Sequence, residues 1–138
     1  MIKTRIEDSL YPQLIEKARE ALSNAYCPYS GYKVGAAVLT VKGKIYTGCN
    51  IENGSYGAAN CAERTAVFKA VSEGEREFSA IAIFTEEGND PPFPCGICRQ
   101  VLTEFCSPDM PVIVYDGERS LYNFTLGELI PFSFTFDK

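Results

Sequence analysis

Residues 33–41 predict a β-strand with two apolar faces. Its side chains alternate between Val34, Ala36 and Val38 on one face and Gly35, Ala37, Leu39 and Val41 on the other. A strand of this kind must be covered on both sides, so we expect a sheet with packed elements on either face. The chain has 138 residues, enough for one domain with its own core, and we expect residues 1–138 to form that domain.

Helices and apolar strands alternate along the rest of the chain. Amphipathic periodicity predicts helices at residues 11–25, 61–71, 95–105 and 126–130. Runs rich in β-branched and aromatic residues predict further strands at residues 44–50, 80–85, 112–115 and 121–124. The helix at 95–105 is expected to bury Ile97, Val101, Leu102 and Phe105. This order indicates an α/β fold, a three-layer α-β-α sandwich around a mixed sheet of about five strands.

The chain contains six cysteines and no histidine. Without an imidazole it has no Ser-His-Asp triad, no Cys-His nucleophile pair and no HExxH metalloprotease site. Any chemistry must therefore depend on carboxylates, thiols, hydroxyls or a bound metal.

Charge and hydropathy exclude two kinds of partner. The chain has 18 acidic and 13 basic residues, and its net charge of −5 is the wrong sign for binding a nucleic-acid backbone. Its apolar runs are too short to cross a bilayer, and residues 1–10 lack the apolar stretch of a signal peptide. We therefore expect a cytoplasmic protein with no nucleic-acid or membrane partner, whose cysteines are free thiols or metal ligands rather than disulfides.

Three of the cysteines lie at the predicted starts of two helices. Cys95 and Cys98 form a Pro-Cys-x-x-Cys motif, in which a spacing of three puts both sulfurs on one side of the first turn. Cys61 begins the helix at 61–71. Zinc favours thiolates, and the positive ends of two helix dipoles stabilise their charge. The sequence therefore predicts one Zn²⁺ per chain, with Arg64, one turn after Cys61, donating to a ligand sulfur.

Glu63 follows Cys61 by two positions, which places a carboxylate beside an ion that has only three protein ligands. Zinc with three protein ligands and a water is typical of catalytic sites, and a nearby carboxylate can take and deliver the proton of that water. The alternative is a solvated acid that the helix dipole favours in a first turn. The downstream Pro-Cys-x-x-Cys motif favours the catalytic interpretation.

Cys-Ala-Glu followed by Pro-Cys-Gly-Ile-Cys resembles the zinc deaminase signature in its three-cysteine form. The chain resembles the small, homotetrameric nucleoside cytidine deaminases over nearly its whole length. The matching stretches are Tyr29-Ser30 with Val34-Gly35-Ala36-Ala37, Gly48-Cys49-Asn50-Ile51-Glu52-Asn53, Cys61-Ala62-Glu63-Arg64-Thr65-Ala66, Pro94-Cys95-Gly96-Ile97-Cys98-Arg99-Gln100 and Glu128-Leu129-Ile130-Pro131. The resemblance implies hydrolytic deamination of cytidine and 2′-deoxycytidine in pyrimidine salvage, with Cys61, Cys95 and Cys98 as zinc ligands and Glu63 as the proton shuttle.

The resemblance also implies how the nucleoside is held. Asn50 and Glu52 match the pair that binds the ribose hydroxyls, and backbone groups near Ala62 are expected to read the edge of the base. Tyr32 occupies the position of a phenylalanine that stacks on the pyrimidine. Phe134 matches a C-terminal phenylalanine that reaches a neighbouring subunit's site, although it also fits an ordinary core or interface aromatic. The family likeness therefore predicts a homotetramer with sites at subunit interfaces.

Two other interpretations remain open at this stage. In a structural zinc module, a fourth thiolate such as Cys49 would close the coordination shell. A deaminase of the same fold could instead act on another aminopyrimidine or on a nucleoside antibiotic, although the Asn50–Glu52 pair favours an ordinary ribose. If they bind no metal, Cys27, Cys49 and Cys106 are expected to be small buried hydrophobes.

Overall fold

The computed structural model describes residues 2–4, 11–86, 88–117 and 120–136. Most of residues 1–10, the segment without a signal-peptide pattern, lies outside the described residues. The elements are β1 (Ile2–Thr4), α1 (Pro12–Leu22), β2 (Val34–Thr40), β3 (Ile45–Cys49), the 3₁₀ turn η2 (Tyr56–Ala58), α2 (Ala62–Ser72), β4 (Phe78–Thr85), α3 (Gly96–Phe105), β5 (Pro111–Tyr115), β6 (Leu121–Thr125) and α4 (Leu126–Leu129). From α1 onward this order confirms the expected succession of helices and strands.

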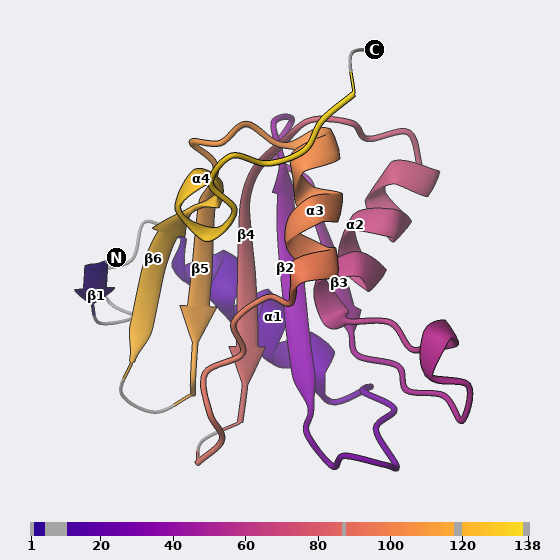
Figure 1. The fold of residues 1–138 in the computed structure, drawn as a ribbon. Coiled ribbons are helices and arrows are strands. Elements are labelled where there is room, and N and C mark those ends of the chain that lie inside the picture. The colour runs from indigo at the N-terminus through magenta and orange to yellow at the C-terminus, as the bar shows by residue number, and fades with distance from the viewer. Residues whose placement is uncertain (1, 5–10, 87, 118–119, 137–138) are drawn as a thin grey trace.

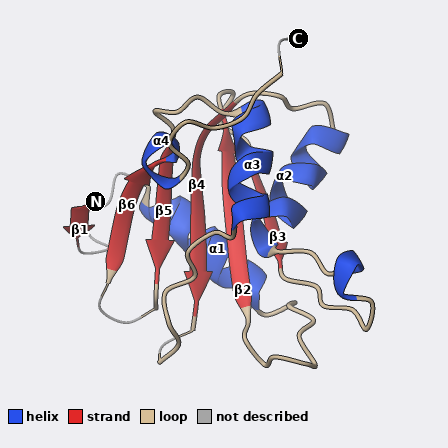
Figure 2. Cartoon of the chain, viewed as in Figure 1, coloured by secondary structure: helices blue, strands red, loops and turns tan. Residues whose placement is uncertain are grey.

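The strands form one mixed sheet in the order β1-β6-β5-β4-β2-β3. β4 and β5 are parallel and joined through α3, whereas the other neighbours are antiparallel. α1 covers one face, and α2, α3 and α4 cover the other (Figures 1 and 2). The three-layer α-β-α sandwich is confirmed, and the short edge strand β1 is an addition that the sequence pattern did not predict.

β2 lies at the centre of the layers, as its two apolar faces require. Val34, Ala36 and Val38 pack in the cluster beneath α2 and α3, whereas Ala37 packs in the cluster beneath α1. The buried face of α1 consists of Leu14, Ile15, Ala18 and Leu22. Burial on both faces therefore fixes the sheet between its helices.

Two glycines allow the helices to lie very close to the sheet. A Cβ atom at Gly48 in β3 would lie 2.5 Å from the backbone nitrogen of Ala66 in α2, and one at Gly35 in β2 would overlap the backbone of α1 at Ala18. The small side chains of α2 at this contact, Ala62, Ala66 and Ala70, are completely buried. This close packing sets the position of the N-terminus of α2 over the sheet.

Two predicted core side chains instead face solvent. Val41 is 54% exposed because the pairing of β2 with β4 shifts register between Leu39 and Thr40, which turns Thr40 inward and ends the strand. Ile97 is 61% exposed because it lies in the first turn of α3, whose buried residues are Cys98 and Leu102. Ile97 lines a surface pocket beside Asn50 instead.

Candidate metal and substrate site

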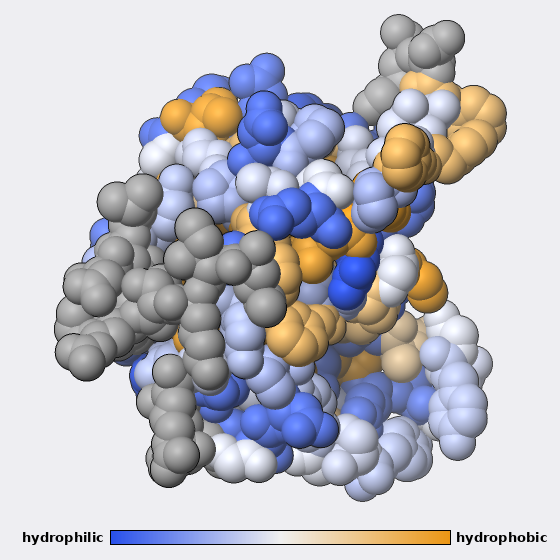
Figure 3. All heavy atoms as spheres, turned by 60° about the vertical axis from the view of Figure 1, so that its left-hand side comes forward, coloured by the Kyte–Doolittle hydropathy of each residue, from blue (hydrophilic) through white to orange (hydrophobic). Residues whose placement is uncertain are grey.

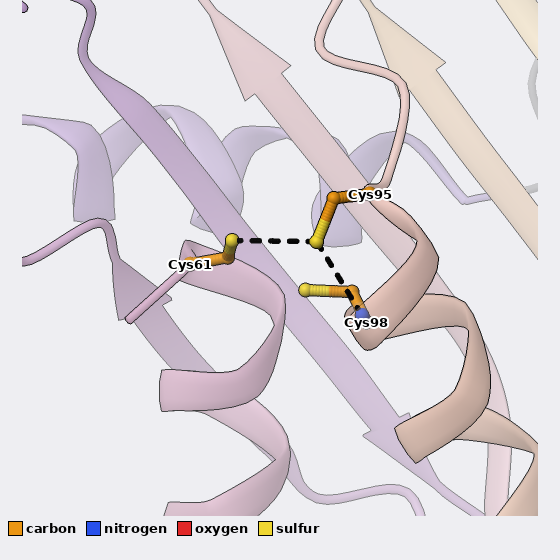
Figure 4. A group of neighbouring side chains, drawn as sticks. All are labelled: Cys61, Cys95 and Cys98. Carbon is orange, nitrogen blue, oxygen red and sulfur yellow. Dashed lines mark hydrogen bonds between the residues drawn. The ribbon is translucent and has the colours of Figure 1, made fainter. Parts of the chain in front are cut away.

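The sulfurs of Cys61, Cys95 and Cys98 converge between the starts of α2 and α3. All three Sγ atoms lie within 4.8 Å of one another, and the Cys61 and Cys95 sulfurs are 3.7 Å apart. Figure 4 shows the side chains pointing toward one another, Cys61 from α2 and the other two from α3. The sequence prediction of one three-thiol cluster is confirmed in its geometry.

Helix starts create this convergence. Cys61 is the N-cap of α2 and Cys95 is the N-cap of α3, both with extended backbone angles, and the Cys98 amide donates to the Cys95 sulfur at 3.5 Å. Because α2 and α3 lie on the same face of the sheet, their N-terminal ends meet at the cluster (Figure 1). The backbone amides of both first turns point toward the cluster end of each helix and favour negative charge on the sulfurs.

Arg64 supplies positive charge to the cluster. Its Nη2 donates to the Cys61 sulfur at 3.3 Å. Hydrogen bonds from Cys98 and then from Arg64 lower the pKa of the Cys61 thiol, which favours the thiolate form that binds metal. The expected donor to a ligand sulfur is therefore in place.

The donor set fits zinc. Three thiols at mutual ligand spacing, without histidine, form the soft donor set that zinc accepts. Arg64 Nε is buried and has no hydrogen-bond partner among the described residues, and an anionic metal–thiolate centre beside it would balance its charge. Cys49 is not part of the cluster. The fourth thiolate that a closed structural site requires is therefore not supplied by the expected residue.

Glu63 is buried at the inner end of the same site. Only 5% of the residue is exposed, and burial raises the pKa of its carboxyl group to about 7. A carboxyl group with a pKa near neutrality can both accept and donate a proton under working conditions. A residue so deeply buried is not the solvated acid considered as the alternative.

A pocket of about 230 Å³ opens beside the cluster. Its lining residues come from four parts of the chain: Tyr32, Val34, Asn50, Cys61, Ala62, Glu63, Pro91, Pro92, Phe93 and Cys95. The structure therefore brings the expected Tyr32, Asn50 and Ala62 together with Glu63 and two of the metal-binding thiols. Pro91, Pro92 and Phe93 were predicted only as loop, and their position just before the Pro-Cys-x-x-Cys motif was the available signal.

Asn50 and Glu52 organise the loop that precedes β2. The side-chain Nδ2 of Asn50 donates to the Tyr32 carbonyl at 2.7 Å, and its Oδ1 accepts from the Val34 backbone amide at 2.9 Å. Asn50 lines the pocket, whereas Glu52 lines a neighbouring hollow that shares Asn50 and Cys61 with it. Both side chains thus lie at the mouth of the site and also hold the backbone in place.

The Glu52 carboxylate is held by three donors. It accepts from the Tyr29 amide at 3.0 Å, from the Ser30 amide at 3.1 Å and from the Ser30 hydroxyl at 2.5 Å. These hydrogen bonds lower the pKa of Glu52, and the one from the Ser30 hydroxyl has the largest effect. A carboxylate has about four acceptor positions, so one remains for a further hydroxyl.

Tyr32 bridges two walls of the pocket. Its hydroxyl donates to the Asp90 carbonyl at 2.7 Å, and its backbone amide donates to the Ser30 hydroxyl at 3.0 Å. Burial raises the pKa of the phenol, so the hydroxyl stays protonated and can donate. The structure thereby supplies the partner that a tyrosine needs at this position.

Phe134 lies away from the pocket of its own chain. It is 64% exposed, its ring packs edge-on against Phe136 at 4.9 Å, and its carbonyl accepts from Gln100 of α3. Phe132 and Phe136 are exposed as well, and apolar side chains mark the projecting C-terminal segment (Figure 3). Within this chain Phe134 is therefore not a core residue.

The remaining cysteines lie outside the cluster. Cys27, Cys49 and Cys106 are half-buried, so they are less enclosed than expected, and burial raises the pKa of Cys106 to about 12. None of the six cysteines, all of which lie in the described residues, forms a disulfide. Among the described helices, none combines the length and apolar character that crossing a bilayer requires.

Comparison with known proteins agrees with this geometry. Residues 9–114 match the family described as the cytidine and deoxycytidylate deaminase zinc-binding region. A cytidine deaminase of Sporosarcina psychrophila is 48% identical over 124 residues, which cover 89% of this chain and 90% of that protein. A blasticidin-S deaminase of Bacillus cereus is 31% identical over 130 residues, covering 89% of this chain and 91% of the relative.

The fold matches a solved structure from the same group. The crystal structure of cytidine deaminase from Burkholderia pseudomallei has a TM-score of 0.85 and 44% identity, covering 91% of this chain and 100% of that one. The chain therefore belongs to the cytidine and deoxycytidylate deaminase family of zinc-binding proteins.

Proposed function

We propose that this protein is a zinc-dependent hydrolase that converts cytidine and 2′-deoxycytidine to uridine and 2′-deoxyuridine with release of ammonia. The observation that carries the proposal is the three-thiol cluster of Cys61, Cys95 and Cys98 in one pocket with the buried carboxyl of Glu63. The reaction adds one water and releases one ammonia, which is the chemistry required in pyrimidine salvage.

Cys61, Cys95 and Cys98 would hold the ion, and Glu63 moves the protons. When bound, zinc supplies a Lewis acid that turns water into a nucleophile near neutral pH. Glu63 accepts one proton from the attacking water and delivers it to N3 of the base, and it then carries the second proton of that water to the amine, which leaves as ammonia. The Glu63 pKa of about 7 suits a group that must accept and release a proton in each cycle.

Residues at the mouth of the pocket orient the nucleoside. Asn50 keeps a second amide proton and Glu52 one acceptor position for the ribose hydroxyls, beyond the bonds they make to backbone. The Tyr32 ring offers an aromatic face to the pyrimidine, and Ala62 at the start of α2 lines the pocket beside it. No lysine or arginine is among the described residues that line the pocket, so a free nucleoside fits it better than a nucleotide.

The assembly that completes the site is proposed to be a homotetramer. Phe132, Phe134 and Phe136 expose apolar rings on a projecting segment, as a side chain that inserts into a neighbouring subunit would. Sedimentation velocity at decreasing protein concentration, with activity followed in parallel, tests this assembly. A dilute monomer with full activity would exclude interfacial sites.

We propose that residues 1–138 form a single domain with one such site. We also propose that the protein works in the cytoplasm, where reducing conditions keep the three thiols free to bind metal. The test is ammonia release from cytidine, deoxycytidine, cytosine, CMP and blasticidin S, with zinc content measured on the same preparation. We expect turnover of the two nucleosides, little with cytosine or CMP, and one zinc per chain. Preferred turnover of blasticidin S would transfer the assignment to an antibiotic deaminase.

A further inference from the structure

Two walls of the pocket come from distant parts of the chain. Tyr32, Val34 and Asn50 form one wall, whereas Pro91, Pro92 and Phe93 belong to the loop that leads into Cys95. Tyr32 and Asp90 are 58 positions apart, and the hydrogen bond between the Tyr32 hydroxyl and the Asp90 carbonyl joins these two segments. A contact of this kind can set the width of the pocket.

The first wall is rigid around Tyr32. Its amide donates to the Ser30 hydroxyl, which donates to the Glu52 carboxylate, and its carbonyl accepts from the Asn50 amide. The backbone of Tyr32 is thus fixed on both sides, and its hydroxyl contacts the second wall. A side chain anchored in this way can restrain a less regular partner.

The second wall, residues 90–93, is irregular backbone with few anchors of its own. The side-chain amide of Asn89 donates to the Thr85 hydroxyl at 3.3 Å. The Phe93 ring packs edge-on against the rings of Tyr122 and Phe124 in β6, with centroid distances of 5.4 and 5.9 Å. Between these contacts lie Asp90 and two consecutive prolines. Since proline fixes φ, holding Asp90 at one end and Phe93 at the other determines the path between them.

We propose that the Tyr32 hydroxyl is a positioning group that holds residues 90–93 against the nucleoside pocket and thereby raises affinity for the nucleoside. The role rests on the proposed function, because it acts on the site assigned to the nucleoside. The hydroxyl neither transfers a proton nor binds the metal. Its loss therefore weakens binding of substrate and product while the chemistry at Glu63 continues.

Tyr32→Phe tests the proposal, because it keeps the ring and removes only the oxygen. We expect KM for cytidine and Kd for the product uridine to rise by about two- to tenfold, the range for loss of one neutral hydrogen bond, with kcat changed less. Hydrogen exchange of a peptide covering residues 88–95 in the metal-loaded protein should become faster. Tyr46→Phe, in β3 and packed against the core away from the pocket, is the matched control and should change none of these values.

Unchanged hydrogen exchange in Tyr32→Phe would overturn the proposal, because the hydroxyl would then not hold residues 90–93. Faster exchange with unchanged KM and Kd would overturn its role in nucleoside affinity. A fall in kcat with constant KM would also contradict it, since the hydroxyl would then act on the chemical step. If the wild-type protein fails to deaminate any nucleoside, the proposed function fails by itself, and the exchange experiment still tests the contact between the two walls.

Discussion

The metal end of the pocket and its mouth are built in different ways. At the metal end, Glu63 and Cys98 lie in the first turns of two helices and Cys61 caps one of them, and close packing of α2 on the sheet sets the position of its start. At the mouth, Tyr32 and Glu52 belong to irregular segments joined by hydrogen bonds across long stretches of sequence. The starts of two helices therefore position the reacting groups, whereas substrate affinity depends on tertiary contacts between loops.

The two regions should therefore respond differently to mutation. Loss of a ligand or of the buried carboxyl at the metal end should remove most or all of the reaction, because no other metal-binding side chain among the described residues joins the cluster. Changes at the mouth should produce graded losses, because several hydrogen bonds share the work of holding each loop.

The largest effect is expected from removing a ligand. Cys98→Ser replaces a buried thiol with a hydroxyl that stays protonated, so zinc and ammonia release should both fall below detection. Metal analysis and an ammonia assay on the same sample measure this. Cys106→Ser is the control outside the cluster and should keep one zinc per chain; a Cys98→Ser protein with full metal would break the assignment of the ligands.

Glu63→Gln should follow with a loss of about 10²- to 10⁴-fold in kcat, the usual contribution of a general acid–base group. The amide keeps the size of the side chain but cannot carry the proton, so zinc content should remain at one per chain. Steady-state kinetics with cytidine measure the effect. Activity within a few-fold of wild type would remove the proton-transfer role from Glu63.

A smaller effect is expected at Arg64, which supports a ligand without being one. Arg64→Gln removes the donor to the Cys61 sulfur and should weaken zinc affinity by about 10- to 100-fold, as loss of a residue behind a metal ligand does. Competition with a chromogenic chelator measures that affinity. Arg76→Gln is the matched control, because Arg76 lies beyond the far end of α2 and donates to the Val71 carbonyl. Equal affinities in the two variants would contradict the role of Arg64.

The smallest effect is expected at Glu52, and it should depend on pH. Its folded-state pKa is lowered, chiefly by the Ser30 hydroxyl, so its stabilising contribution is complete above the unfolded value of about 4.3 and disappears as pH falls through the folded value. Glu52→Gln should lower Tm at pH 7, and the difference from wild type should shrink at pH 3. Calorimetry at both pH values checks this, with Glu16→Gln on the exposed face of α1 as control. A difference that stays constant would mean that the Glu52 charge does not hold residues 29–30.

The sequence predicted the metal end well because its signals are local. The spacing of Cys95 and Cys98, the position of Cys61 at a helix start and Glu63 two residues later depend only on helix geometry. The two apolar faces of residues 33–41 likewise required the layered fold. The place of each residue on its own helix or strand could be predicted because it depends on neighbours along the chain, whereas the meeting of Cys61 with Cys95, 34 positions later, depends on both helices lying on one face of the sheet.

The errors and omissions arose where tertiary contacts decide. Ile97 has the periodicity of a buried residue, but the first turn of α3 lies at the site, where no layer covers it. Val41 was misplaced because the irregularity at Leu39 and Thr40 depends on the neighbouring strand β4. The link from Tyr32 to Asp90 crosses 58 positions and leaves no local pattern. Family resemblance supplied Asn50 and Glu52, whose own sequence context predicts only a polar loop.

Stepwise zinc titration of the metal-free protein with cytidine as substrate tests the central claim most directly. If Cys61, Cys95 and Cys98 hold the one ion on which deamination depends, ammonia release should rise in proportion to added zinc and stop rising at one zinc per chain. Turnover in the metal-free protein, or a fully zinc-loaded protein that releases no ammonia from cytidine, would contradict the account.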